Sequence, residues 1–125
     1  MNNQVNAAGG ISIHAVDISR GIPAESLKVS LYYLRNGELA EIASGCCDRD
    51  GLLQHPVSTG EGVKQGTYEV QFDVGSYYRK TGIELPKPAF LETAHFRFGI
   101  AQVTEHFHLP FKFTPWGLSL FRGGA

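Results

Sequence analysis

The chain has 125 residues and a mass of 13.7 kDa, the size of one domain that can bury a core without disulfides or structural metal ions. Its formal net charge is -1, and no run of Lys or Arg occurs. This balance excludes the basic surface expected of proteins that bind nucleic acid or an anionic membrane. With 15 Gly and 6 Pro in short groups, the composition is typical of many turns that join short strands, and it indicates a mostly β protein.

Residues 1–10 are polar and lack both the basic start and the apolar stretch of a secretion signal. No apolar run elsewhere is long enough to cross a membrane. We therefore expect a cytoplasmic protein with a flexible N-terminal arm at 1–10 and a single domain at 11–125. Cys46 and Cys47 are adjacent, which is poor geometry for a disulfide, and we interpret both as reduced small residues near a turn.

The first half of the chain predicts strands from period-two alternation. Residues 11–19 alternate, and His14 falls on the opposite face from Ile11 and Ile13. Residues 27–33 form a second half-buried strand, and Asn36-Gly37 predicts a tight hairpin with 39–44 returning antiparallel.

The middle of the chain predicts a turn at 48–51, a short strand at 52–55 that Pro56 stops, and a polar loop at 58–62. The clearest alternation in the sequence, at 68–74, predicts a further strand.

The second half predicts one or two helical turns at 76–81, before the proline-rich breaker at 85–88. A strand follows at 90–100, and the tail supplies a final strand or two. Seven or eight short strands with one short helix predict a two-sheet β-sandwich.

The stretch at 105–110 places two imidazoles on one side of a strand. In an extended chain His106 and His108 share a face, while Phe107 and Leu109 point the other way. A histidine pair on a strand also fits metal ligation, and the third ligand would have to be His14, His55 or His95. Because no spacing selects one of them, we expect no metal and no cofactor.

Two boxes carry a resemblance to a known family. HFHLP at 106–110, a Pro-Trp-Gly turn and Phe-Arg-Gly-Gly at 121–124 form the first, and ISIHAVD at 11–17 with Gly-Ile-Pro-Ala at 21–24 forms the second. Together they resemble the 5-hydroxyisourate hydrolases, transthyretin-like enzymes of purine breakdown. The resemblance runs from about residue 11 to residue 124.

The resemblance implies a transthyretin-like fold, hydrolysis of 5-hydroxyisourate and an active site. His14, His108 and Arg122 match family positions assigned to catalysis. In that family they converge in a channel where two dimers pack together, which implies a homotetramer built as a dimer of dimers.

Opening a cyclic amide with water needs a base, a group that stabilises the developing oxyanion and an acid for the leaving nitrogen. Histidine transfers protons near neutral pH, and arginine is always charged. We expect His14 and His108 to share proton transfer and Arg122 to orient a small polar cyclic substrate.

The chain departs from the family pattern at a few positions. Leu52 stands where the family has an arginine after its Asp-Gly turn, and Arg49 is the candidate replacement. In the tail, Phe121 replaces a tyrosine and Gly124 replaces a serine. The substrate-binding candidates are Arg49, His106, Phe121, Gly123 and Gly124.

Other interpretations stay open. A lone histidine on a strand face, such as His14, also occurs as a packed, hydrogen-bonded residue, and His55 and His95 match no assigned role. The chain as a whole also fits a transthyretin-like binding or assembly module without hydrolase activity. A third possibility is a family member recruited to another ring-opening or ring-forming reaction in a biosynthetic pathway.

Overall fold

The structure, a computed structural model, describes residues 7–124 and contains eight strands, one α-helix and a short 3-10 helix. The strands are β1 (Ile11–Asp17), β2 (Ile22–Pro23), β3 (Lys28–Arg35), β4 (Glu38–Cys46), β5 (Gly66–Phe72), β6 (Ala94–Ile100), β7 (Phe107–Thr114) and β8 (Gly117–Leu120). The 3-10 helix η2 spans Pro56–Thr59, and the helix α1 spans Val74–Lys80. The predicted strand-rich fold with one short helix is confirmed.

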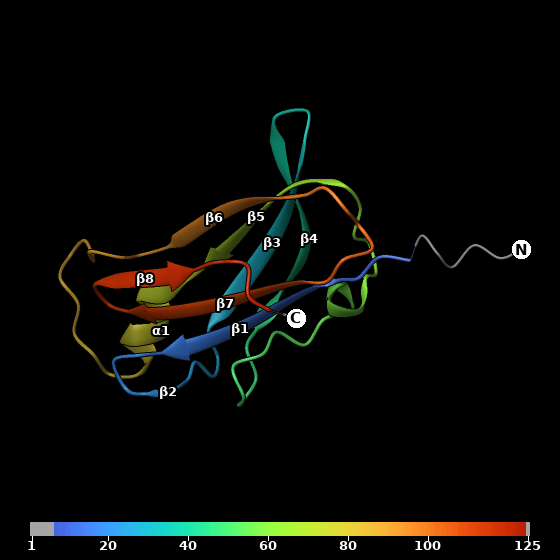
Figure 1. The fold of residues 1–125 in the computed structure, drawn as a ribbon. Coiled ribbons are helices and arrows are strands. Elements are labelled where there is room, and N and C mark those ends of the chain that lie inside the picture. Colours follow the sequence, from blue (N-terminus) through green and yellow to red (C-terminus); the bar gives the residue numbers. More distant parts are fainter. Residues whose placement is uncertain (1–6, 125) are drawn as a thin grey trace, which may run out of the picture.

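The strands form two four-stranded sheets, in the orders β2-β1-β7-β8 and β4-β3-β5-β6. Figure 1 shows the two sheets as separate layers, with the β3–β4 hairpin extending beyond the sandwich. β1 and β7 run parallel although they come from opposite ends of the sequence, whereas the other paired strands are antiparallel. This pairing brings the two boxes of the sequence side by side.

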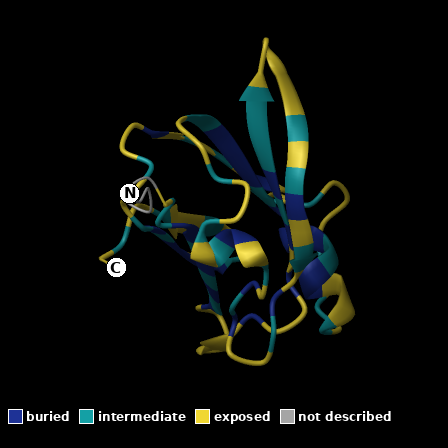
Figure 2. Ribbon diagram, turned by 90° about the vertical axis from the view of Figure 1, so that its right-hand side faces the viewer, coloured by how far each residue is buried: buried dark blue, intermediate teal, exposed yellow. Residues whose placement is uncertain are grey.

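The core lies between the sheets because each strand turns its apolar face inward. Phe72 of β5 stacks on Phe111 of β7 with ring centroids 3.9 Å apart. Figure 2 shows the buried positions concentrated in the strands and the exposed ones in turns and at the hairpin tip. The fully buried side chains of β1, β5 and β7 include Ile11, Ile13, Ala15, Tyr68, Val70, Phe72, Leu109, Phe111 and Phe113.

A buried carboxylate joins the end of β1 to the helix α1. Asp17 is fully buried, and it accepts hydrogen bonds from the hydroxyls of Tyr78 at 2.7 Å and Tyr77 at 3.1 Å. The guanidinium of Arg20 and the hydroxyl of Ser19 also donate to it. Burial is the largest single effect and opposes ionisation, but these donors together outweigh it and hold the pKa of Asp17 below its usual value.

The strand predicted at 52–55 is wrong. Leu52 forms only an isolated antiparallel bridge with His14, and η2 begins at Pro56. Pro56 has no N–H to offer a strand partner, and the ring nitrogen Nδ1 of His55 accepts from the Val57 N–H and caps the turn instead. Part of the polar loop predicted at 58–62 is therefore helical.

The flexible arm predicted at 1–10 lies partly outside the described residues, since the structure describes the chain from residue 7. Gly9 donates its N–H to the carbonyl of Val103 at 2.9 Å, and Phe107 donates to the carbonyl of Gly10 at 2.9 Å. These contacts hold the approach to β1 against the approach to β7. Within residues 7–124, no helix is long and apolar enough to cross a membrane.

Candidate active site

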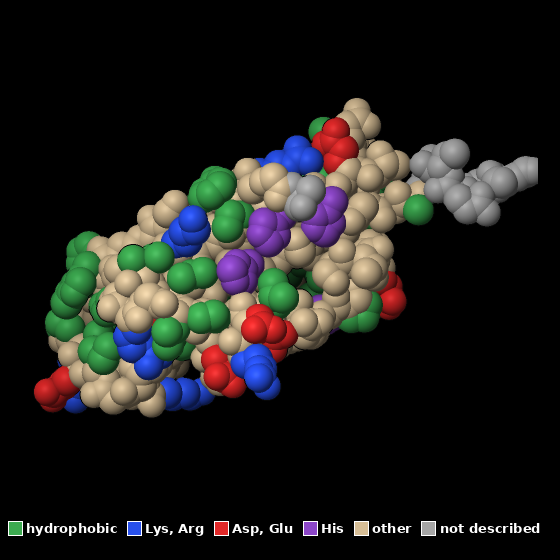
Figure 3. All heavy atoms as spheres, turned by 60° about the horizontal axis from the view of Figure 1, so that its bottom comes forward, with side chains coloured by type: hydrophobic (Ala, Val, Ile, Leu, Met, Phe, Trp, Pro, Cys, Tyr) green, Lys and Arg blue, Asp and Glu red, His purple; other side chains and the backbone are tan. Residues whose placement is uncertain are grey.

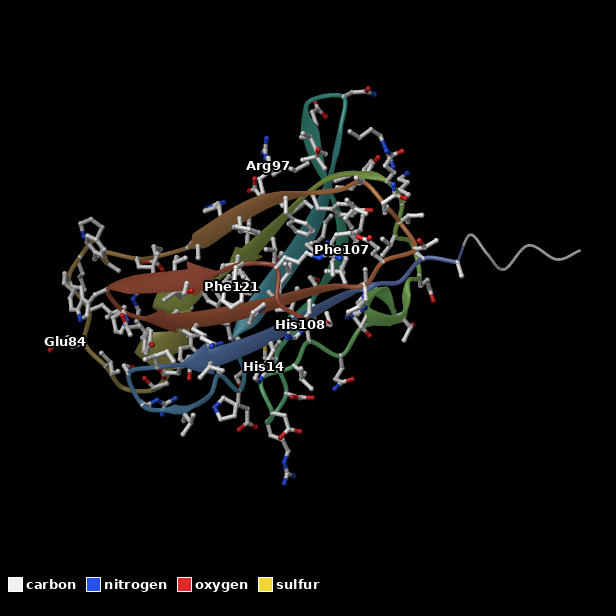
Figure 4. The ribbon with its side chains drawn as sticks, viewed as in Figure 1. His14, Glu84, Arg97, Phe107, His108 and Phe121 are labelled. Atoms are coloured by element: carbon white, nitrogen blue, oxygen red, sulfur yellow. The ribbon has the colours of Figure 1, made fainter. Side chains whose placement is uncertain are left out.

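Histidines gather on the outer face of the sheet that contains β1 and β7. The parallel register places Ser12 beside His108 and His14 beside Pro110, so the polar side chains of both strands emerge on one face. Figure 3 shows histidine side chains clustered on this face, and Figure 4 shows His14 and His108 as neighbours. The prediction that His106 and His108 share a face is confirmed, because both bond to Ser12.

A chain of hydrogen bonds connects the two histidines of β7 and its approach. The hydroxyl oxygen of Ser12 lies 2.7 Å from Nε2 of His106 and 2.7 Å from Nδ1 of His108. The other ring nitrogen of His106, Nδ1, lies 2.6 Å from the carbonyl oxygen of Gly9. His106, a substrate-binding candidate, therefore has both ring nitrogens engaged within the protein.

His14 is held by the turn at 48–51. Its Nε2 lies 3.0 Å from the carbonyl oxygen of Asp50. The carboxylate of Asp48 fixes the turn by accepting from the N–H groups of Asp50 at 2.8 Å and Leu52 at 3.0 Å. Since a carbonyl oxygen only accepts, Nε2 of His14 carries the proton, and Nδ1 is its free end.

The environment of His108 favours the neutral imidazole. Burial lowers the pKa of His108 below the usual histidine value, and the nearby His14 and His106 lower it further. A histidine that is neutral near pH 7 and half-buried on an open face can accept a proton from water.

The C-terminal tail runs alongside β7 at His108, where Gly123 forms an isolated antiparallel bridge. β8 ends at Leu120, and Gly123 donates its N–H to the carbonyl of His108 at 2.7 Å. A Cβ on Gly123 would lie 3.1 Å from Cδ of Pro110 and 3.2 Å from Cδ2 of His108. The absence of a side chain at Gly123 therefore lets the tail lie directly against the histidine.

Arg122 is near the cluster but faces other partners. Its guanidinium lies 3.1 Å from the carbonyl oxygen of His106 and 3.2 Å from Oε1 of Glu105. It also stacks over the ring of Phe107 at 4.1 Å from the centroid. Within residues 7–124, the hydrogen bonds of Arg122 go to Glu105 and to the backbone rather than to His14 or His108.

The remaining candidates lie at the edges of this face or elsewhere. Arg49, Phe121 and Gly124 are exposed. His95 bonds to Glu69 on the other sheet, and His55 caps η2, so neither adds a third ligand to the cluster. In the part of the chain that the structure describes, no three His, Cys, Asp or Glu side chains are arranged to hold a metal ion.

Sequence reasoning did not single out Ser12 or the carbonyls of Gly9 and Asp50. The alternation of β1 does place Ser12 on the same face as His14. Its two histidine contacts depend on the pairing of β1 with β7, for which the sequence carries no local signal.

A two-sheet sandwich that carries a histidine pair on one outer face is the architecture of a transthyretin-like protein. The family model described as HIUase/Transthyretin family matches residues 11–123. The chain belongs to this family, and the resemblance of its two boxes is confirmed.

Individual relatives agree with the family match. A protein of Pseudomonas aeruginosa named 5-hydroxyisourate hydrolase is 37% identical over 115 residues, which cover 92% of this chain and 91% of that protein. The solved structure of Klebsiella pneumoniae 5-hydroxyisourate hydrolase has a TM-score of 0.73 and 31% identity, covering 91% of this chain and 97% of that one.

A second solved structure, (S)-allantoin synthase, has a TM-score of 0.86 and 30% identity. The match covers 95% of this chain but only 45% of that protein. The similarity therefore extends to less than half of that longer chain.

Proposed function

We propose that this protein hydrolyses 5-hydroxyisourate, or a closely related small cyclic amide or ureide, by opening its ring with water. The observation that carries the proposal is the placement of His14 and His108 together on one face, with the pKa of His108 lowered. The names of the Pseudomonas and Klebsiella relatives support the choice of substrate.

The geometry supports general acid-base catalysis by the two histidines. The cycle starts with His14 carrying a second proton, on Nδ1, in addition to the Nε2 proton that the carbonyl of Asp50 accepts. Neutral His108 takes a proton from water, and the hydroxide adds to the ring carbonyl. The ring C–N bond then breaks, its electron pair stays on nitrogen, and that nitrogen takes the Nδ1 proton of His14. Transfer of the proton from His108 back to His14 restores both groups, so the net reaction consumes one water.

Arg122 and the tail form the substrate-binding side of the proposed site. Arg122 provides a positive charge for a ring oxygen or the oxyanion, and its guanidinium turns from Glu105 and the His106 carbonyl toward the substrate when the ring binds. Gly123 lies against His108, while a Cβ on Gly124 would meet nothing within 4 Å, so the ring binds beside Gly124 and the exposed Phe121 packs against it. Arg49 is exposed in the turn that holds His14, from which it can extend toward a substrate.

The protein assembles, in this proposal, as a homotetramer made from a dimer of dimers. β6 and β8 are edge strands of their sheets, and edge strands need a partner or protection. Large apolar side chains near β8 are exposed: Phe90, Trp116, Leu118 and Phe121. The free thiols of Cys46 and Cys47 suit a reducing cytoplasm.

Leu52 favours a second candidate function, the processing of a less polar ring. An apolar side chain borders His14 where the related enzymes, by the family pattern, carry an arginine. The likeness to (S)-allantoin synthase supports recruitment to another step on a similar ring.

The test is a direct assay with freshly made 5-hydroxyisourate, followed by absorbance as the rate above spontaneous decay. We expect the wild-type protein to accelerate the decay catalytically. If decay is not accelerated, this substrate is wrong, and related cyclic ureides become the next to assay.

A further inference from the structure

We propose that Ser12 and His106 are positioning residues that fix the tautomer of His108. During turnover, a proton shifts from His108 through Ser12 to His106, which then carries the positive charge. This inference rests on the proposed hydrolase function, in which His108 is the base. It goes further by assigning a role to two side chains that bridge from the base to the backbone of Gly9.

The carbonyl of Gly9 fixes which atom donates in each hydrogen bond of the series that links His108, Ser12 and His106. A carbonyl oxygen only accepts, so Nδ1 of His106 must donate to it. In neutral His106 the other nitrogen, Nε2, is then an acceptor, and the Ser12 hydroxyl donates to it. Ser12 has a single proton, so it must accept from His108.

His108 therefore carries its proton on Nδ1, which donates to Ser12 at 2.7 Å. Its Nε2 is left with a free lone pair, the form that a base requires. Without these hydrogen bonds, a neutral imidazole distributes between two tautomers, and only one of them presents a lone pair at Nε2.

The same contacts provide a path for a proton. When Nε2 of His108 takes a proton from water, the Nδ1 proton can pass to Ser12 while the Ser12 proton passes to Nε2 of His106. No proton is lost: His108 becomes neutral with a proton on Nε2, Ser12 is again a hydroxyl, and His106 carries the positive charge. After His14 has protonated the leaving nitrogen, the same shifts run in reverse: His106 returns its proton through Ser12 to Nδ1 of His108 as the Nε2 proton of His108 passes to His14.

Three features of the surroundings bear on this transfer. His14 faces His108 from β1, and together with burial and His106 it disfavours a positive charge on His108. Near His106, the carboxylate of Glu105 and the guanidinium of Arg122 are paired with each other at 3.2 Å, so their charges offset one another. The carbonyl of Gly9 keeps Nδ1 of His106 as a donor, which leaves Nε2 as the atom that receives the proton.

The alternative is that Ser12 merely ties β1 to β7. A purely structural link would affect neither the tautomer of His108 nor proton transfer, so measuring these two properties separates the structural role from the proposed one. Ser12→Ala removes the link, and Ser12→Thr keeps a hydroxyl. His106→Gln keeps a hydrogen-bonding side chain toward Ser12 but cannot accept a proton. Ser30→Ala, on β3 of the other sheet, is the matched control.

Nitrogen-15 NMR of the imidazole rings in the full-length protein tests the tautomer. We expect neutral wild-type His108 to be protonated on Nδ1 alone. Ser12→Ala should give a mixture of the two His108 tautomers, and Ser12→Thr should restore the single Nδ1-protonated form. A wild-type His108 protonated on Nε2 when neutral would overturn the proposal. This measurement needs no substrate, so it stands or fails independently of hydrolysis.

Kinetics test the relay. We expect Ser12→Ala and His106→Gln to lower kcat by about 10-fold with KM little changed, a smaller loss than the roughly 100-fold or more expected when the group that transfers the proton directly is removed. Ser12→Thr should recover most of the loss, and Ser30→Ala should match wild type. If both site variants keep wild-type kcat, the relay is wrong. If the wild-type protein is inactive but His108 has the expected tautomer, the proposed substrate is wrong and the tautomer assignment still holds.

Discussion

Leu52 pairs directly with His14: their backbones form an isolated antiparallel bridge between the turn at 48–51 and β1. Residues opposite each other in an antiparallel pair place their side chains on the same face. The side chain at position 52 therefore decides what borders the proposed catalytic histidine, and in this protein that side chain is the apolar one of leucine.

Restoring polarity at this border should raise activity on 5-hydroxyisourate. We expect Leu52→Arg combined with Gly124→Ser to increase kcat/KM about 10-fold, since a hydrogen bond to a developing charge contributes about 1.5–3 kcal/mol. Steady-state kinetics of the double variant provide the measurement. Leu39→Arg, on β4 of the other sheet, is the control for an added charge. A double variant with unchanged kcat/KM would mean that the pocket is shaped for a different ring.

Replacing Gly51 should destabilise the fold more than replacing Gly37, because only at Gly51 would a Cβ collide with a neighbouring backbone atom. Both have φ of +80°, but a Cβ on Gly51 would collide with the carbonyl oxygen of Ala15, whereas a Cβ on Gly37 has nothing within 4 Å. We expect Gly37→Ala to cost about 1–2 kcal/mol from its backbone conformation alone. Gly51→Ala should cost clearly more and should also lower kcat, because the carbonyl that holds His14 belongs to the neighbouring Asp50. Urea unfolding at one protein concentration measures both variants, and equal losses would contradict the steric argument.

The sequence predicts the parts of this fold that depend on local patterns. Alternation predicts β1 and β5, and Asn36-Gly37 predicts the β3–β4 hairpin, because side-chain period and turn chemistry act over a few residues. The two-sheet sandwich follows from the number and length of such strands.

The sequence does not predict features that depend on distant pairing. The parallel contact of β1 with β7 decides that Ser12 bonds to His106 and His108, and no local pattern encodes it. The short strand expected at 52–55 is absent because proline chemistry and the His55 cap stabilise a turn there. The two histidines of the site could be named from the resemblance, but the partners of Arg122 could not.

Asp17 should contribute stability that depends on pH. We expect Asp17→Asn to lower the free energy of unfolding by about 1–3 kcal/mol at pH 7, because four donors are arranged around a buried carboxylate. The folded pKa lies below the unfolded value of 3.8, so the stabilisation is present above that pH and is lost as pH falls through the folded pKa.

The difference in unfolding free energy between wild type and Asp17→Asn should therefore narrow in acid. Denaturant unfolding at a series of pH values measures it, and the exposed Glu84→Gln is the control. A difference that stays constant from pH 7 down through the titration of Asp17 would contradict the assignment.

The assembly state is a separate prediction. We expect light scattering after size-exclusion chromatography to give about four times the chain mass of 13.7 kDa, because closed symmetric assembly protects the free edges of both sheets. Trp116, which is 61% exposed, should matter to it, and Trp116→Arg should shift the protein toward smaller species. A wild-type protein that elutes as a monomer at micromolar concentration would rule the tetramer out.

Arg122 should act on substrate binding more than on proton transfer. We expect Arg122→Ala to raise KM, lower kcat or both, since the variant loses the positive charge that orients the ring. Arg122→Lys keeps the charge but loses the planar fork, and it should recover only part of the loss. Full activity in Arg122→Ala would remove this residue from the site.

The proposed catalysis depends most on His14 and His108, and the most direct test is the rate of 5-hydroxyisourate decay, above background, for their alanine variants. We expect His14→Ala and His108→Ala each to lower kcat by about 100-fold or more, the range for general acid-base groups, with the assembly unchanged. His55→Ala and His95→Ala, whose rings bond to the Val57 N–H and to Glu69, should keep wild-type rates. An active enzyme whose rate is unaffected by loss of either His14 or His108 would show that its catalytic site lies elsewhere.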